Sequence, residues 1–189
     1  VAKLLENKEE LVEELAWQMG RPTRFGGEWG PMNARVDYMS AIAEKTLAPE
    51  MVEDGETFTR YLAREPVGVI FIIAPWNYPF QMAGWKILPA ISAGNTIVIK
   101  PSELTPSTTL MLAEACTAAG IPDGVVNVVL GPGRSVGQSL VGHSDVNMVS
   151  FTGSTQVGVF VLRAAARRPC GTLLALGGKA PFVVFDDAD

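Results

Sequence analysis

Two short runs of apolar, mostly β-branched residues constrain the fold of this chain more than any other feature. They are Val69–Ile73 and Thr96–Ile99, and neither run alternates with polar residues. An unbroken apolar run of this length is typical of a strand that is buried on both faces, as in a parallel sheet. Each run is followed by a turn and a helical segment, and parallel strands need such a crossover connection. The sequence therefore predicts the α/β class, with a doubly wound parallel sheet.

The same alternation of strand, turn and helix continues along the chain. Thr105 is expected to cap a helix that has Pro106 at its first position and ends at Gly120. Four further segments are expected to be strands of the same sheet, namely Val125–Leu130, Met148–Phe151, Thr172–Leu176 and Phe182–Phe185.

The residues before the first of these strands predict two amphipathic helices and a hairpin. Gly20 is expected to end the first helix, and residues 48–66 are expected to form an exposed β-hairpin arm. The hairpin is indicated by the turn signal at Asp54 and Gly55 and by weak alternation over residues 57–62. The helices are indicated by apolar residues at helical spacing, first at Leu4, Leu5, Leu11, Val12, Leu15 and Met19, then at Val36, Met39, Ile42 and Leu47.

Composition and charge exclude several classes of protein. The chain has 189 residues, of which 48% are hydrophobic, and its 15 basic and 20 acidic residues give a net charge of −5. This length is enough for a buried core, and the charge argues against nucleic acid as a partner. The longest apolar stretch, residues 67–76, is too short to span a bilayer, so no membrane association is expected.

Cysteine and histidine usage bears on the compartment and on metals. Only Cys116 and Cys170 are available for a disulfide, and the first residues lack the features of a secretory signal. We therefore expect a cytoplasmic protein. The one histidine, His143, has no cysteine or histidine cluster around it in the sequence, so no metal site is expected.

A rigid segment follows the first buried strand. Pro75 and Pro79 flank Trp76, Asn77 and Tyr78, and the prolines restrict the backbone on both sides of the Asn77 amide. An amide donor held in this way can stabilise the oxyanion of a tetrahedral intermediate. The alternative is that Asn77 only closes a turn, as asparagine often does.

A charged turn, Lys100-Pro101-Ser102-Glu103, follows the second buried strand. A carboxylate just past a strand end can accept hydrogen bonds from ribose hydroxyls in dinucleotide-binding folds. Glu103 would also repel a 2′-phosphate, which favours NAD over NADP, and Lys100 can bind the same ribose. The alternative is a solvated salt bridge within the loop.

Two glycine turns complete the set of motifs. Residues 131–137 follow the pattern G-x-G-x-x-x-G, one residue longer than the usual dinucleotide fingerprint, and indicate little when taken alone. Residues 151–158, Phe-Thr-Gly-Ser-Thr-Gln-Val-Gly, place amides and hydroxyls at a helix start, which is a suitable site for a phosphate. The alternative for this second turn is simply a helix capped by Ser154 or Thr155.

Taken together and in this order, Pro-Trp-Asn, Lys-Pro-Ser-Glu, Phe-Thr-Gly-Ser-Thr and Leu176-Gly177-Gly178-Lys179 resemble the aldehyde dehydrogenase superfamily. The similarity covers residues 1–189, but only the N-terminal part of the family's chain, which is more than twice as long. It implies a Rossmann-like NAD-binding domain in residues 1–47 and 67–177. It also implies an oligomerisation hairpin in residues 48–66, hence a homo-oligomer of the full-length protein, and the start of a catalytic domain in residues 178–189.

The resemblance implies roles for individual residues. Asn77 matches a donor to the oxyanion of the bound aldehyde, and Lys86 matches a lysine with a role in proton relay. Lys100 and Glu103 are expected to hold the adenosine ribose, with Gly133 and Gly137 against the adenine and the turn at residues 153–154 near the pyrophosphate. The full set that matches cofactor-binding positions is Ile73, Pro75, Trp76, Lys100, Ser102, Glu103, Gly133, Gly137, Phe151, Gly153, Ser154, Val157, Leu176 and Gly177.

The chain departs from the family at the general base. The family has a glutamate immediately before Leu-Gly-Gly-Lys, where this chain has Ala175. A methyl group cannot accept a proton, so the base that activates water is missing. The family's nucleophilic cysteine follows further along, and neither Cys116 nor Cys170 matches its position. Members that transfer the acyl group to coenzyme A often lack this glutamate, and an engineered inactive variant or a diverged paralogue would also explain its absence.

The expected function is the NAD(P)-dependent oxidation of a small-molecule aldehyde to a carboxylic acid, with NAD as the preferred cofactor. Because the nucleophile and the base are both missing, the isolated chain is expected to be catalytically incompetent. The alternatives are a CoA-acylating aldehyde dehydrogenase and a non-catalytic nucleotide-binding or interaction module.

Overall fold

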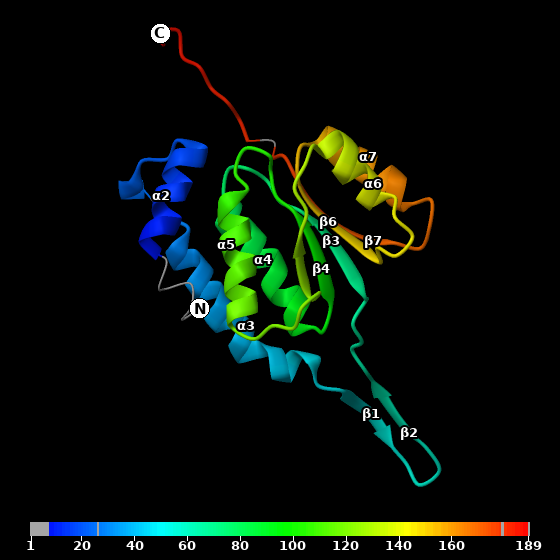
Figure 1. Cartoon of the computed structure of the whole chain (residues 1–189). Helices are drawn as coiled ribbons and strands as arrows, with labels where there is room; N and C mark the ends of the chain where they lie inside the picture. The colour runs from blue at the N-terminus through cyan, green and yellow to red at the C-terminus, as the bar shows by residue number, and fades with distance from the viewer. Residues whose placement is uncertain (1–7, 26, 179, 189) are drawn as a thin grey trace.

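The computed structural model describes residues 8–25, 27–178 and 180–188 (Figure 1). Its centre is a five-stranded sheet in which every neighbouring pair of strands is parallel. The predicted α/β class and the doubly wound, Rossmann-like parallel sheet are therefore confirmed. In spatial order the strands are β5 (Val126–Val128), β4 (Thr96–Lys100), β3 (Val69–Ile73), β6 (Met148–Gly153) and β7 (Gly171–Leu176).

Helices cover both faces of this sheet, as Figure 1 shows. On one side lie α4 (Pro79–Ser92) and α5 (Ser107–Ala118), with α2 (Lys8–Met19) and α3 (Trp29–Leu47) outside them. The other side carries α6 (Gln138–Val141), which continues the π-helical turn η2 (Gly133–Gly137), and α7 (Thr155–Ala165). A short 3₁₀ turn, η1 (Thr23–Phe25), follows α2. Among the described residues, no helix combines the length and the apolar character needed to cross a bilayer.

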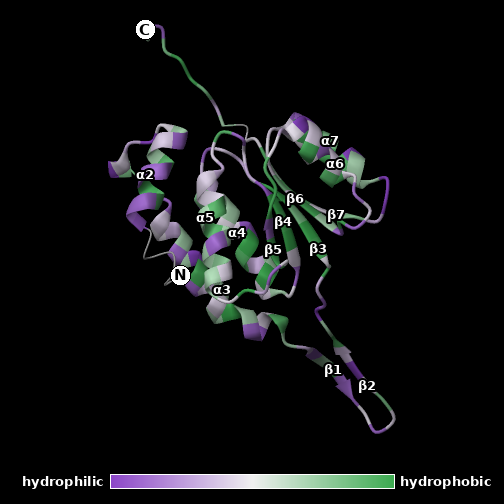
Figure 2. Cartoon of the chain, viewed as in Figure 1, coloured by the Kyte–Doolittle hydropathy of each residue, from purple (hydrophilic) through white to green (hydrophobic). Residues whose placement is uncertain are grey.

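The unbroken apolar runs lie at the centre because successive side chains of a strand point to opposite faces. In β3, Ile70 and Ile72 belong to a core that includes Ile87 of α4. Phe71, which lies between them, belongs to a second core that includes Val161 of α7. Figure 2 shows the apolar colour of these strands between the two helix layers. Both faces of β3 therefore need apolar side chains, which explains why the run does not alternate.

The N-terminal helices and the hairpin also agree with the sequence. Gly20 follows α2 with a φ of 68°, a conformation that favours glycine at a helix end. Leu4 and Leu5 lie outside the described residues. The expected arm is a two-stranded antiparallel hairpin, β1 (Glu50–Asp54) and β2 (Thr59–Leu62), which projects away from the helices and the sheet (Figure 1).

Two expectations about local structure are wrong. Thr105 does not cap α5, because its side chain is fully buried and its hydroxyl has no hydrogen bond within the described ranges. The helix start is capped from α2 instead, since the Oε1 atom of Gln18 accepts a hydrogen bond from Ser107 N at 3.2 Å. Residues 182–185 form no strand, because no neighbouring strand of the described chain pairs with their backbone, and Phe182 is 92% exposed.

The close crossing of α3 and α4 depends on Gly84. A Cβ atom at this position would overlap the end of the Met32 side chain, which is only 1% exposed and has little room to move. We expect Gly84→Ala to lower the free energy of unfolding by about 1–3 kcal/mol through overpacking. The better helix propensity of alanine, about 1 kcal/mol, offsets only part of this loss. Urea unfolding followed by circular dichroism measures the change.

Gly30→Ala is the matched control, because Gly30 is an exposed residue of α3 and its Cβ would meet no atom within 4 Å. Its free energy of unfolding should stay the same or rise slightly. Equal effects of the two substitutions would contradict the packing argument.

Candidate functional site

A cleft of about 780 Å³ lies where the central strands of the sheet end. It forms there because β3, β4 and β5 build the sheet outward in one direction and β6 and β7 continue it in the other. The crevice next to this reversal is the usual ligand site of open parallel sheets. Its lining consists of Ile73, Ala74, Pro75, Trp76, Asn77, Lys100, Ser102, Glu103, Leu104, Phe151, Thr152, Gly153, Ser154, Val157, Ala175, Leu176 and Gly177.

Strand register brings these residues together. Ile73 is the partner of Lys100 on one side and of Phe151 on the other, so three predicted residues share one level of the sheet. Gly153 is the partner of Leu176 at the next edge. A larger hollow, of about 1,230 Å³, runs along α2 and the loop after it, but none of the predicted residues lines it.

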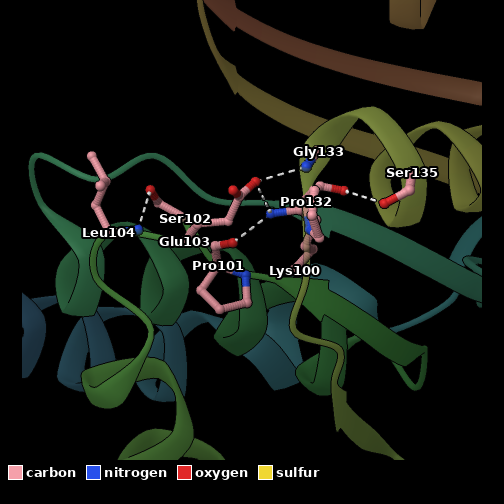
Figure 3. A network of polar contacts seen from close by, with 8 residues as sticks. All are labelled: Lys100, Pro101, Ser102, Glu103, Leu104, Pro132, Gly133 and Ser135. Atoms are coloured by element: carbon pink, nitrogen blue, oxygen red, sulfur yellow. Dashed lines mark hydrogen bonds and ion pairs between the residues drawn. The ribbon is translucent and has the colours of Figure 1, made fainter.

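The Lys100–Glu103 turn forms a connected polar network, shown in Figure 3. The Lys100 side chain is only 5% exposed, and its Nζ donates to the Pro101 carbonyl at 2.8 Å. The same Nζ lies 4.0 Å from Oε1 of Glu103, whose side chain is 55% exposed. Burial lowers the pKa of Lys100, and the Glu103 carboxylate partly opposes this effect. The salt bridge expected as the alternative is thus present as a long contact, but its lysine is buried rather than solvated.

The glycine turn at residues 131–137 is joined to this network. Gly133 N donates to Oε1 of Glu103 at 2.7 Å (Figure 3). Gly137 is buried, and a Cβ atom there would lie 3.8 Å from Cδ of Lys100. Neither glycine lines the cleft itself. Gly133 instead holds the Glu103 carboxylate through its main-chain N–H, and Gly137 lies close to the Lys100 side chain.

The segment containing Asn77 forms one wall of the cleft, directly before α4. Trp76 and Asn77 are exposed, whereas Pro79 is the first residue of the helix and is buried. No described residue forms a hydrogen bond with the Asn77 side-chain amide, but its main-chain oxygen accepts one from Nη2 of Arg21 at 2.8 Å. The amide is therefore available to a bound molecule.

The start of α7 forms the opposite wall. Ser154 is its N-cap, and its Oγ accepts a hydrogen bond from Val157 N at 3.4 Å, as the alternative for this turn expected. A Cβ atom at Gly153 would overlap the ring of Phe151, so any other residue here would displace that ring. Since a helix N-terminus carries partial positive charge, the cap does not prevent this end from receiving an anion.

The end of β7 contributes Ala175, Leu176 and Gly177 to the cleft. Ala175 is exposed and offers only a methyl group to the cleft. The described part of the cleft lining contains one carboxylate, that of Glu103, and no cysteine. Burial raises the pKa of the Cys116 thiol, which makes it a poor nucleophile.

Lys86 does not line this cleft. It lies on α4 beside a separate cavity of about 260 Å³, where its Nζ donates to Oγ of Ser150 at 2.7 Å. Burial lowers the pKa of Lys86 from its ordinary value of 10.5 to about 8. The cavity is walled mainly by apolar side chains, including Trp85 and Leu173.

Sequence reasoning missed several residues of the cleft and its support. The cleft is also lined by Ala74, Leu104 and Thr152. These residues were not predicted, although their neighbours in the sequence were. Arg21 and Glu28, which hold the Asn77 segment, come from a glycine-rich loop without periodicity. The only sequence signal for these two residues was that a basic and an acidic residue occur in the same loop. Within the described ranges, no group of histidine, cysteine, aspartate or glutamate side chains is arranged to hold a metal ion.

Comparison with known proteins identifies the family. The family model described as "Aldehyde dehydrogenase family" matches residues 1–189, so the chain belongs to the aldehyde dehydrogenase family. The peroxisomal aminoaldehyde dehydrogenase 1 of Pisum sativum is 42% identical over 193 residues, covering 100% of this chain and 38% of that protein.

Two solved structures show the same fold in relatives with a bound dinucleotide. PnpE in complex with nicotinamide adenine dinucleotide matches with a TM-score of 0.89 and 39% identity, over 100% of this chain and 39% of PnpE. A 3,6-anhydro-L-galactose dehydrogenase in complex with NADP matches with a TM-score of 0.86 and 41% identity, over 97% of this chain and 39% of that one. The chain thus spans less than two-fifths of the length of these relatives.

The low pKa of Lys86 has a consequence for stability. Between pH 8 and pH 10.5 the folded chain binds fewer protons at Lys86 than the unfolded chain does, so stability should rise with pH across this window. Below it, the cost of burying the charge is fully present. We expect the double substitution Lys86→Met with Ser150→Ala to remove this rise and to add about 1 kcal/mol at neutral pH.

Urea unfolding at a series of pH values measures both effects. Ser150→Ala alone is the control, since it leaves the ammonium in place and should keep the pH dependence. A slope that survives in the double variant would show that another group causes it.

Proposed function

We propose that this chain is the cofactor-binding part of an enzyme that oxidises an aldehyde to a carboxylic acid, and that it binds NAD in the cleft at the strand ends. The observation that carries the proposal is the convergence on one cleft of Asn77, the Lys100–Glu103 turn and the start of α7. These groups come from three separate strand ends. Membership of the aldehyde dehydrogenase family supports the same reading.

The residues present fit a dinucleotide. The cleft volume, about 780 Å³, is within the usual range for cofactor sites. Glu103 offers a carboxylate to ribose hydroxyls, and the start of α7 offers main-chain N–H groups to the pyrophosphate. Bound NAD would supply the hydride acceptor.

Preference for NAD over NADP follows from Glu103. Its carboxylate stands at the mouth of the cleft, with Gly133 N holding one oxygen. A 2′-phosphate placed beside it would meet like charge. Relatives of known structure have been found with NAD and with NADP, so the preference is argued from this side chain alone.

Asn77 is proposed as the oxyanion donor. Its exposed side-chain amide has no partner among the described residues, and it precedes the N-terminus of α4. Both features suit a group that must donate to negative charge developing on an aldehyde oxygen. Lys86 lies beside another cavity, so a part in proton relay would need a path from that cavity to the cleft.

The residue at the position of the general base is proposed to limit the chemistry. With alanine at 175, no side chain at the end of β7 can activate water to release the acyl group. A thiol acceptor such as coenzyme A needs less help, which supports the CoA-acylating alternative. A non-catalytic nucleotide-binding or interaction module fits the same substitution, since binding requires no base.

The hairpin of residues 48–66 is proposed to join copies of the full-length protein. It stands clear of the sheet (Figure 1) and exposes several large apolar side chains, which favours contact with another chain. These are Met51, Val52, Phe58, Tyr61 and Leu62. We also propose that residues 1–47 and 67–177 form an NAD-binding domain and that a catalytic domain begins at residue 178.

We also propose a cytoplasmic location. It rests on the small number of cysteines, Cys116 and Cys170, neither of which is in a disulfide. The Pisum sativum relative is named as peroxisomal.

Calorimetric titration tests cofactor binding. We expect the purified chain to bind NAD and to bind NADP more weakly. Glu103→Gln should raise the Kd for NAD about tenfold, because an accepting carboxylate is lost, and should narrow the difference between NAD and NADP. Glu53→Gln, on the exposed hairpin, is the matched control and should leave both constants unchanged. Absence of any heat of binding with NAD would overturn the proposal.

Catalytic incompetence of the isolated chain is tested by NADH absorbance. With NAD and an aldehyde present, we expect no aldehyde-dependent NADH formation, because the described part of the cleft lining contains no thiol and has alanine at position 175, where the family has its general base. A complete aldehyde dehydrogenase in the same assay is the positive control. NADH formation that persists after repurification would contradict this expectation, and loss of it in Cys116→Ser or Cys170→Ser would identify the thiol.

A further inference from the structure

One arginine connects the loop before α3 to the wall of the cleft. The guanidinium of Arg21 donates from Nη2 to the main-chain oxygen of Asn77 at 2.8 Å and from Nη1 to Oε1 of Glu28 at 2.8 Å. Its Cζ also lies 4.4 Å from the centre of the Tyr78 ring. Arg21 therefore contacts two consecutive residues of the segment that carries the candidate oxyanion donor.

Glu28 links Arg21 to the start of α4. Its side chain is fully buried, and its Oε2 accepts a hydrogen bond from Gln81 N in the first turn of α4 at 2.8 Å. Glu28 is also the N-cap residue of α3, but its side chain forms no capping hydrogen bond there and its carboxylate instead lies at the N-terminal end of α4. Burial raises the pKa of Glu28, and the Gln81 N–H and the Arg21 charge oppose that rise.

The arrangement clamps a short stretch of chain at both ends. Arg21 holds it at Asn77, and Glu28 holds it four residues later at Gln81. Between them the loop that follows β3 enters α4, with Pro79 at the first helical position. A segment fixed at two points and stiffened by proline has little freedom to move its exposed side chains.

Stability alone does not account for this pair. A buried ion pair contributes little net free energy, and apolar residues of similar size often serve as well or better. The pair instead satisfies main-chain groups, the Asn77 oxygen and the Gln81 N–H, that apolar residues could not satisfy.

We propose that Arg21 and Glu28 are positioning residues for the cleft: they fix the Trp76–Asn77 wall in the place where it meets a bound dinucleotide and an aldehyde oxygen. The expected effect of the pair on NAD binding rests on the proposed function of the cleft. The expected effect on the mobility of the loop does not. Neither residue touches the cleft itself. Each acts through the main chain of the segment.

The test uses the 189-residue chain with Arg21→Met and Glu28→Met combined, so that no buried charge is left without a partner. Hydrogen exchange read by mass spectrometry should show faster exchange in peptides covering residues 74–82. Peptides from β4 and β6 should keep their protection. The Kd for NAD should rise about fivefold or more, since a displaced wall loses its contacts.

The matched control combines Arg60→Met with Glu53→Met, which removes an exposed ion pair of 3.0 Å on the hairpin. It should change neither the exchange of residues 74–82 nor the affinity for NAD. Unchanged exchange at residues 74–82 in the Arg21/Glu28 variant would overturn the inference. So would loss of protection throughout the chain, since the pair would then be needed for folding and not for the loop.

The two proposals fail in different ways. If the unaltered chain does not bind NAD, the proposed function fails, and the exchange experiment still decides whether the pair positions the loop. If the unaltered chain binds NAD and the double variant binds it equally well, only the positioning role is lost.

Discussion

The middle of the central strand β3 is buried on both faces, because α4 packs on one side of it and α7 packs on the other side of the sheet. Parallel neighbours, β4 and β6, take up its main-chain hydrogen bonds. A strand enclosed in this way needs a helix after every strand to carry the chain back to the starting edge. All strands then end at one edge, and the loops there must contain whatever polar groups the protein uses. The cleft is thus a consequence of burying β3.

Charged side chains around this edge are kept out of water to different degrees. Burial raises the pKa of Glu28 and lowers the pKa of Lys86 and of Lys100, which favours the neutral form of each group. Each charged group nevertheless has a polar partner, since an unpaired buried charge would cost far more than these contacts return. For Glu28 and Lys100 the partners include main-chain groups of the loops at the strand ends. These charged side chains hold the loops in position more than they increase the stability of the fold.

The sequence was sufficient for the five strands of the sheet, although it also predicted a strand at residues 182–185 that does not form, and for most of the cleft, because these depend on patterns that are local. Unbroken apolar runs identify buried strands, and the residues after them occupy the common edge. Contacts between distant segments were not predictable in this way. The cap on α5 comes from Gln18, and the support of Asn77 comes from Arg21, each through a pairing that no periodicity encodes. Lys86 lies on a face of α4 that opens to another cavity, and helical spacing alone did not show which.

The contact between Gly133 and Glu103 uses only the main-chain N–H of the glycine. A side chain at 133 would meet no atom within 4 Å, whereas Gly131 has a φ of 138°, a conformation in which other residues are strained. Of the glycines in this turn, then, the one that binds the acidic side chain tolerates replacement, whereas Gly131 does not. Divergent sequences could therefore have another residue in place of Gly133 and still hold the Glu103 carboxylate. Proline is the exception, because it has no main-chain N–H to donate. A search for relatives that relies on the spacing of these glycines would overlook such sequences.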